Sequence, residues 1–350
     1  MASKYTEQRH HQCNLTGDDH AIHQCESFHA GRRKRGRGFE YHLLEGIKIT
    51  DKALLQHFKH LAIPPMWLDV RISVCQQSKV QAFGYDQRNR KQYIYHPQWE
   101  QQRQAEKFSR LADFADQLAT IRKAYVSDLS RADWDIQKST ALALLLLDRT
   151  GIRIGNRQYS NENGTVGLTT LRRKHLEGNE TELTLAFTGK HGKQRHIDIT
   201  DATAGQLISE SASKPGYPLF RYRTGKHWQD LLSDDVNERL RELVDLDISA
   251  KDFRTWTGTR LAMQLAHQAS SQVNQYPRRK FSATLVKLVA GVLGNTPAIC
   301  EKYYIHPAVL SYLQSQHEKN GTCQQYRETA DWMNTNLSSC EKAVLEVIAA

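Results

Sequence analysis

The chain has 350 residues, 39% of them hydrophobic and 25% charged, so it can bury one large core or, as we expect, two ordinary ones. Its formal charge of +10 favours a polyanionic partner, because binding to phosphates releases condensed counterions. No apolar run is long enough to span a bilayer, and the N-terminus lacks the apolar core of an export signal. The six cysteines show no paired spacing, which is typical of reduced thiols. We therefore expect a cytoplasmic protein with no membrane partner.

Residues 1–30 are rich in His, Gln and Asp without apolar periodicity, which predicts a mobile tail. Cys13, His20, His23 and Cys25 are of zinc-binding types, but their spacing matches no compact motif, so we expect no metal and no cofactor. A basic cluster at residues 32–38 follows. It is either a solvated linker or a flexible arm that follows phosphates, and the sequence leaves both open.

Residues 31–105 read as a small, mostly β N-terminal domain. Alternating polar and apolar residues predict strands over 69–74 and 80–85, and a helical segment lies near 53–60. Residues 88–96 interleave cations with aromatics. Cations on one face and rings on the other would suit a surface along a duplex, whereas the alternative is a solvated face with core tyrosines.

Residues 106–316 read as a larger, mainly helical domain, followed by a C-terminal extension over 317–350. The one clear β element is a hairpin with strands over 182–187 and 194–199 and a basic, Gly-rich tip. The fold class is therefore α+β, with a small hairpin sheet in the larger domain. Predicted helices cover residues 103–126, 137–149, 234–244, 249–269, 281–293 and 341–348.

Breaking a phosphodiester requires a nucleophile, groups that neutralise charge on the phosphorus oxygens, and a proton for the leaving oxygen. Arginine binds phosphate with a permanently charged fork, and lysine can donate a proton. Four segments offer such groups: a Gly- and Ile-flanked arginine, the hairpin tip, the first turn of a helix, and a helix stop that opens a short helix. In chain order the residues are Arg153, Lys190, Arg254, Asn295, Tyr303 and Tyr304.

This ordered set resembles the catalytic residues of type IB DNA topoisomerases, in their short bacterial and poxvirus-like branch. Supporting strings at residues 63–70, 84–93, 162–171, 251–255 and 294–307 spread the resemblance from about residue 30 to about residue 312. Tyr304 directly precedes Ile305-His306-Pro307, where the family places its tyrosine, so we favour it over Tyr303.

The resemblance implies a role for each residue. Tyr304 would attack phosphorus and leave a 3′-phosphotyrosyl bond, Arg153 and Arg254 would clamp the non-bridging oxygens, and Lys190 would protonate the leaving 5′-oxygen. Asn295 stands where much of the family has histidine. Asparagine donates a hydrogen bond but cannot shuttle a proton, so we expect slower chemistry at most.

The resemblance also implies a monomer whose two domains clamp duplex DNA, preferably supercoiled, without metal or ATP. We expect it to be associated with the nucleoid. The side chains that we predict to contact DNA are Arg88, Arg90, Lys91, Tyr93, Arg157, Tyr159, Lys193 and Lys251.

Two alternatives come from other classes. A tyrosine recombinase or integrase has a similar set, but usually with histidine three residues before the second arginine, where this chain has Lys251. The strand-rich N-terminal segment also differs from the helical DNA-binding domain of such enzymes. A non-catalytic basic DNA-binding protein would explain the charge but not the ordered set.

Overall fold

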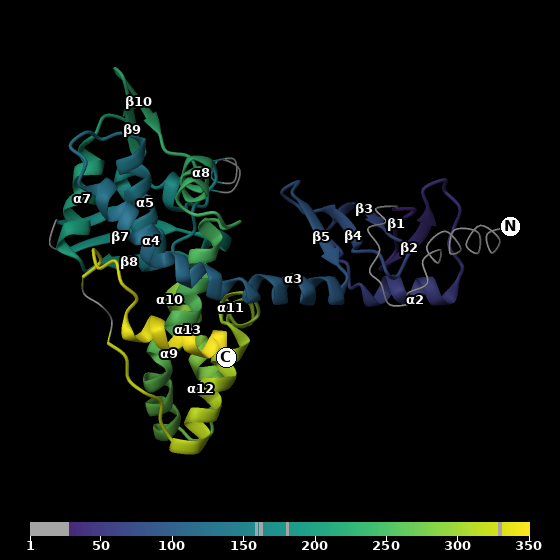
Figure 1. Cartoon of the computed structure of the whole chain (residues 1–350). Coiled ribbons are helices and arrows are strands. Elements are labelled where there is room, and N and C mark those ends of the chain that lie inside the picture. The colour runs from purple at the N-terminus through teal and green to yellow at the C-terminus, as the bar shows by residue number, and fades with distance from the viewer. Residues whose placement is uncertain (1–27, 158–159, 161–163, 180–181, 328–330) are drawn as a thin grey trace. The chain divides into compact units, whose positions relative to one another are not determined.

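The computed structural model describes residues 28–157, 160, 164–179, 182–327 and 331–350. The chain divides into two compact units, Met1–Lys107 and Phe108–Ala350 (Figure 1). Each unit is described by itself. The tail predicted over residues 1–30, with its four zinc-type side chains, lies outside the described residues as far as residue 27.

The N-terminal unit is built on an antiparallel sheet of five strands in the order β2-β1-β3-β4-β5. Helix α2 packs on it through Leu54 and Phe58, and Asp51 caps the helix by accepting the Leu54 backbone N–H at 2.8 Å. The strands and helix predicted near 69–74, 80–85 and 53–60 are confirmed. The elements are β1 (Ala30–Arg35), β2 (Gly38–Leu43), α2 (Lys52–His60), β3 (Leu68–Ile72), β4 (Val80–Tyr85) and β5 (Lys91–Tyr95).

The basic cluster is neither a linker nor a flexible arm, since most of it forms strand β1 and pairs with β2 along its whole length. Gly36 makes the turn between the strands with a positive φ of 55°. Arg32 donates to the Ile63 carbonyl at 2.8 Å and lies 4.1 Å from the centre of the Phe39 ring. Burial lowers the pKa of Arg32. The sequence did not predict this strand because four consecutive cations at residues 32–35 show no alternation of polar and apolar residues.

The prediction for residues 88–96 was wrong in its arrangement. Lys91, Tyr93 and Tyr95 share the exposed face of β5, because residues two apart in a strand point to the same side. The Lys91 ammonium lies 5.3 Å from the Tyr93 ring centre, and the two tyrosine rings stack at 5.8 Å. Tyr93 is 44% exposed and Tyr95 is 41% exposed, so neither belongs to the core.

The C-terminal unit combines helices with two small antiparallel sheets, ordered β6-β7-β8 and β10-β9. Helix α3 (Pro97–Ser109) belongs to the first unit as far as Lys107 and ends in the second. The elements of the C-terminal unit are α4 (Leu111–Leu129), α5 (Ile136–Thr150), η1 (Leu168–Thr170), η2 (Arg173–His175), β6 (Leu176–Asn179), β7 (Glu182–Thr188), η3 (Lys190–Gly192), β8 (Gln194–Ile199), α7 (Ala202–Ser213), β9 (Arg221–Thr224), β10 (His227–Asp230), α8 (Ser233–Leu243), α9 (Ala250–Gln275), α10 (Phe281–Leu293), α11 (Pro297–Tyr304), α12 (Pro307–Asn320) and α13 (Ser339–Ala349).

The predicted α+β class is confirmed, as are the helices that became α5, α8, α10 and α13 and the hairpin β7–β8. The helix predicted over 103–126 is instead two helices, α3 and α4, which meet at Arg110. Helix α9 runs six residues beyond its predicted end, to Gln275. Helices α7 and α12, strand β6 and the hairpin β9–β10 were not predicted.

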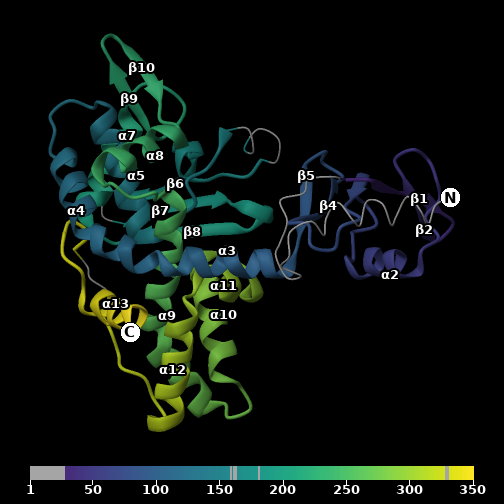
Figure 2. The same cartoon turned by 45° about the vertical axis from the view of Figure 1, so that its right-hand side comes forward.

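Helix α5 is the centre of the larger core. Residues 138–148 of this helix are all buried, as a helix that is apolar on most sides requires. Helix α9 contacts α5, α10, α12 and α13, and the two views in Figure 1 and Figure 2 show α12 and α13 beside it. The C-terminal extension is therefore part of this unit's packing.

Within the described residues, no single helix is long and apolar enough to cross a membrane; α10 and α11 pass that test only as a pair bent by 90°. The four cysteines in the described part of the chain, Cys75, Cys300, Cys323 and Cys340, are buried free thiols.

Phe58 supplies a test of the N-terminal core, because its side chain is 1% exposed and packs against Tyr41 with ring centres 5.3 Å apart. We expect Phe58→Ala to lower the free energy of unfolding of this unit by about 3–5 kcal/mol, in urea denaturation followed by circular dichroism. Lys59→Ala, at an exposed position of the same helix, should change it by no more than about 0.5 kcal/mol. Equal effects of the two substitutions would contradict this packing.

Candidate active site

Arg153 lies just beyond the end of α5. The helix stops at Gly151, which has a left-handed φ of 61°. The chain after it is fixed by the segment that follows Gly167: the Leu168 N–H donates to the Arg153 carbonyl at 2.8 Å, and the Thr169 N–H donates to the Ile154 carbonyl at 2.8 Å. The half-buried Arg153 side chain is thus carried on a backbone with little freedom.

Arg254 lies in the first turns of α9. Ser249 begins this helix in a capping box, where the Asp252 carboxylate accepts the Ser249 N–H at 2.8 Å. Arg254 is 4% exposed, and its guanidinium donates to the Gly151 carbonyl at 2.5 Å and to the Leu293 carbonyl at 2.6 Å. It therefore joins the ends of α5 and α10.

Asn295 lies directly after the Gly294 stop of α10. Its Oδ1 accepts hydrogen bonds from both arginines, from Arg153 and, at 3.2 Å, from Arg254. These two donors identify the carbonyl side of the amide. Its Nδ2 is buried and has no hydrogen-bond partner within the part of the chain that the structure describes. The amide is therefore held with its donor side unused.

Tyr304 ends helix α11, which begins at the Thr296 cap with Pro297 at its first position. Its carbonyl accepts from the Thr259 hydroxyl at 3.3 Å, and its ring centre lies 5.0 Å from the Arg254 guanidinium carbon. Burial lowers the pKa of Arg254 to about 10 and also lowers that of Arg153, while the charge and hydrogen bonding of Tyr304 oppose both shifts. The Tyr304 side chain thus lies beside both guanidinium groups.

The structure brings four of the five predicted catalytic residues together. Lys190, the fifth, is exposed in the turn η3 at the tip of the β7–β8 hairpin. The hairpin is joined to the cluster nearby, because the Lys193 ammonium donates to the backbone carbonyl of Asn295 at 2.6 Å. Lys190 is therefore three residues from a direct contact with the cluster, on a turn with little packing to hold its side chain.

Arg195 is a further cation at this site that the sequence analysis missed. It faces inward from β8, is 9% exposed, and donates to the Val292 carbonyl at 2.7 Å. Burial lowers its pKa, and the charge of Arg153 lowers it further. The signal in the sequence was available, because Arg195 shares the strand alternation of the buried Ile197 and Ile199.

Arg153, Arg195 and Arg254 give the site positive charge that no carboxylate of the described residues balances. Among the described residues no Asp or Glu side chain forms an ion pair with any of them, and the pKa of each is lowered by burial. A bound phosphate would accept their hydrogen bonds and offset this charge. Across the same residues, no group of three or more His, Cys, Asp or Glu side chains could hold a metal ion.

Two predicted DNA contacts are engaged with carboxylates. Arg90 pairs with Asp86 at 2.6 Å, and its hydrogen bond is the main reason that the pKa of Asp86 falls to about 2. Arg157 pairs with Asp230, which also binds Arg221 at 2.5 Å. These arginines would have to share their carboxylates or release them to bind phosphate.

The other predicted contacts differ in accessibility. Arg88 is exposed in the turn between β4 and β5, and Lys251 is exposed at the start of α9. Lys91 and Tyr93 are exposed on β5, as described above, whereas Lys193 is used by the cluster. Tyr159 lies outside the described residues.

Comparison with known proteins agrees with this geometry. Residues 96–330 match the family model of the eukaryotic DNA topoisomerase I catalytic core, and residues 38–86 match that of the bacterial DNA topoisomerase IB N-terminal domain. The first match covers well over half of the chain, so the chain belongs to the type IB DNA topoisomerase family.

Its relatives include viral and plant enzymes. The chain is 28% identical over 296 residues to DNA topoisomerase 1B of Acanthamoeba polyphaga mimivirus, a match covering 82% of this chain and 88% of that one. It is 24% identical over 276 residues to DNA topoisomerase 1B of Vaccinia virus (strain Copenhagen), covering 76% and 84% respectively. DNA topoisomerase 1 beta of Arabidopsis thaliana is 25% identical over 155 residues, covering 44% of this chain and 16% of that one.

Gly294 tests how the cluster is built, because a Cβ at this position would lie 2.5 Å from a guanidinium nitrogen of Arg195 and the φ is 66°. We expect Gly294→Ala to lower the free energy of unfolding by about 1–3 kcal/mol, measured by thermal denaturation. Gly291→Ala, on α10 with open space around its Cβ, should raise it by about 0.5–1 kcal/mol. If both substitutions stabilise the protein, the left-handed stop at residue 294 is not required.

Proposed function

We propose that this protein relaxes supercoiled duplex DNA by cutting and rejoining one strand through a 3′-phosphotyrosyl link. The observation that carries the proposal is the meeting of Tyr304 with Arg153, Arg254 and Asn295 in a site of unbalanced positive charge. Membership of the type IB family supports the same reaction.

In the cleavage step the Tyr304 oxygen attacks a backbone phosphorus and loses its proton to solvent. The new bond is Tyr304 O–P, and the bond that breaks is P–O5′. Arg153 and Arg254 stabilise the charge that develops on the non-bridging oxygens, and Lys190 gives the 5′-oxygen its proton. Religation is the reverse. One phosphodiester replaces another, so the energy of the broken bond is retained and neither ATP nor a metal is required by the balance.

Asn295 would act as a neutral donor in this step. Its Oδ1 already accepts hydrogen bonds from the two arginines. Its Nδ2–H, on the other side of the amide, is still able to donate to a ligand. An amide held in this way stabilises a phosphate oxygen without reorganising during the reaction, and loss of one such donor typically costs about 3–4 kcal/mol of activation free energy. It adds no charge and moves no proton.

We also propose that both units contact one duplex as a clamp and that the protein acts as a monomer on nucleoid DNA in the cytoplasm. The net charge of +10 and the exposed Lys91 and Tyr93 on β5 support contact with phosphates and sugars. Binding should then weaken steeply as salt concentration rises.

Tyr304→Phe tests the nucleophile. We expect this variant to bind duplex DNA as the wild type does but to form no covalent adduct and to leave a supercoiled plasmid unrelaxed, because only the attacking oxygen is removed. The assay is plasmid relaxation in excess EDTA without nucleotide, in which the wild type should be active. Tyr303→Phe is the matched control and should retain activity. Relaxation by Tyr304→Phe would refute the assignment.

Lys190→Ala tests the general acid. We expect single-turnover cleavage to fall by about 10²–10⁴-fold with an ordinary duplex, because the 5′-oxygen leaves as a poor, unprotonated alkoxide. In a substrate with sulfur in place of that bridging oxygen, the leaving thiolate needs no proton. The wild type and Lys190→Ala should therefore cleave this substrate at similar rates. Lys226→Ala, exposed in the turn between β9 and β10, is the control and should cleave both substrates normally. An equal loss on both substrates would exclude the acid role.

A further inference from the structure

The C-terminal helix α13 lies beyond residue 330, where the match to the family catalytic core ends. Ser338 begins this helix and Glu341 completes its capping box: the Glu341 N–H donates to the Ser338 hydroxyl at 3.2 Å, and the Ser338 N–H donates to the Glu341 carboxylate at 2.9 Å. Glu341 is nevertheless 1% exposed, which is far more burial than a capping role alone requires. Its carboxylate must therefore pair with cations inside the unit.

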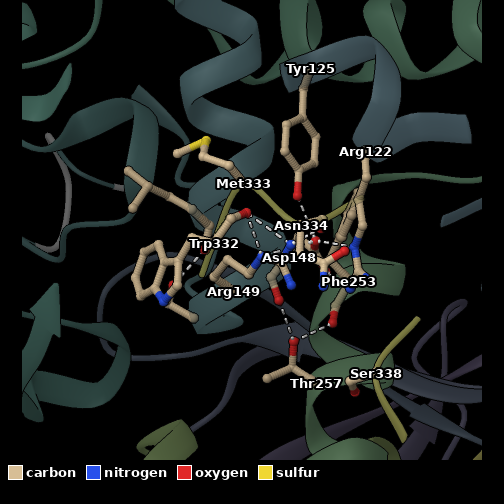
Figure 3. A network of polar contacts seen from close by, with 12 residues as sticks. Arg122, Tyr125, Asp148, Arg149, Phe253, Thr257, Trp332, Met333, Asn334 and Ser338 are labelled. Carbon is tan, nitrogen blue, oxygen red and sulfur yellow. Dashed lines mark hydrogen bonds and ion pairs between the residues drawn. The ribbon is translucent and has the colours of Figure 1, made fainter. Parts of the chain in front are cut away.

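Those charges belong to a buried network centred on Arg122 of α4 (Figure 3). Arg122 donates twice to Asp148 of α5, at 2.8 and 3.0 Å, and twice to Glu341, at 2.6 and 3.0 Å. The Tyr125 hydroxyl adds a bond to Asp148 at 2.9 Å. Burial alone would raise the pKa of both acids, but Arg122 and its cationic neighbours hold both values below normal. The two acids are therefore charged, and each needs its partners.

The network reaches the segment that carries Arg153. Arg149 lies in the last turn of α5 and donates to the Trp332 carbonyl at 2.9 Å and the Asn334 carbonyl at 2.6 Å (Figure 3). Arg149 thus ties the end of α5 directly to residues 332–334, and Asp148 ties it to Glu341 through Arg122. Arg153 follows four residues after Arg149, so the position of its backbone depends on this attachment.

The same network reaches the helix that carries Arg254. Glu341 accepts from the Trp256 indole N–H at 3.3 Å and from Arg260 at 3.5 Å, four residues further along the same face of α9. Arg254 is two residues before Trp256 and points about 200° around the helix from it. One side of α9 therefore faces the catalytic cluster while the opposite side is bonded to Glu341.

We propose that Glu341 is a positioning residue. It sets the spacing of Arg153 and Arg254 by joining the C-terminal end of α5 to the N-terminal part of α9, on the side of α9 that faces away from the catalytic cluster. The catalytic unit is then incomplete without residues 331–349. This proposal rests on the phosphotyrosine chemistry proposed above, in which the two arginines must bind one phosphate together. The neutral variant Glu341→Gln keeps the shape of the side chain and can still cap α13, but it leaves Arg122 and Arg260 short of one negative charge.

The test measures single-turnover cleavage of a suicide duplex at saturating DNA, at a temperature where circular dichroism shows each protein fully folded. DNA affinity is measured separately in the Tyr304→Phe background. We expect Glu341→Gln to cleave about 10- to 100-fold more slowly, because small displacements of catalytic groups have effects of this size, while its dissociation constant stays within about twofold of the wild type. Glu341→Asp should recover part of the rate.

Val344→Ala is the matched control, because Val344 is buried on the same helix and lies outside the charge network. It should lower the melting temperature as Glu341→Gln does, yet cleave like the wild type. Equal cleavage rates in the two variants, whether fast or slow, would overturn the proposal, since α13 would then contribute stability alone.

If Glu341→Gln does not fold, Trp256→Phe tests the proposal in its place, because it removes one hydrogen bond to Glu341 and no charge. We expect cleavage to slow by about 3- to 10-fold at unchanged DNA affinity, from loss of a single buried bond to an ionised group. An unchanged rate would overturn the proposal. A wild-type protein that forms no adduct at all would instead refute the phosphotyrosine reaction.

Discussion

The structure depends on keeping three arginines charged at a largely buried site, where no carboxylate in the described part of the chain pairs with them. Arg254 and Arg195 are held by main-chain carbonyls at the ends of α5 and α10, and Arg153 is held by the Asn295 amide. Carbonyl dipoles orient a guanidinium but do not cancel its charge, whereas an aspartate in the same place would. Helix ends supply such carbonyls in excess, because their last four have no partner within the helix. The site is therefore assembled where helices stop.

A second group of arginines in the same unit is treated in the opposite way. Arg122 is fully buried, and its positive charge is neutralised by two carboxylates, so it would not attract an anionic ligand. The catalytic cluster and this network lie on opposite sides of α9, so one helix separates cations that are available to phosphate from cations that are not. Buried charge is costly in both places. In the network around Arg122 the protein offsets this cost with acids, whereas at the cluster of Arg153, Arg195 and Arg254 main-chain carbonyls and an amide orient the cations without neutralising them.

Much of this was predictable from sequence where local signals agree. The alternation in β4, the Gly294 stop and the Thr296-Pro297 start of α11 each followed from short-range chemistry, and the order of Arg153, Arg254, Asn295 and Tyr304 identified the family. Local rules failed where the decisive partner is distant. The cations of β1 form a strand because β2 and β3 pair with it, and Arg195 binds carbonyls about a hundred residues away. Neither partner can be read from neighbouring residues.

The bond between Arg122 and Glu341 spans 219 residues, and it closes with the last helix of the chain. Before α13 docks, Arg122 is paired with Asp148 but lacks its second carboxylate. Contacts this far apart also form slowly, since a long loop must close first. The attachment of α13 is therefore expected among the later steps of folding, and the backbone before Arg153 becomes fixed only when it has formed.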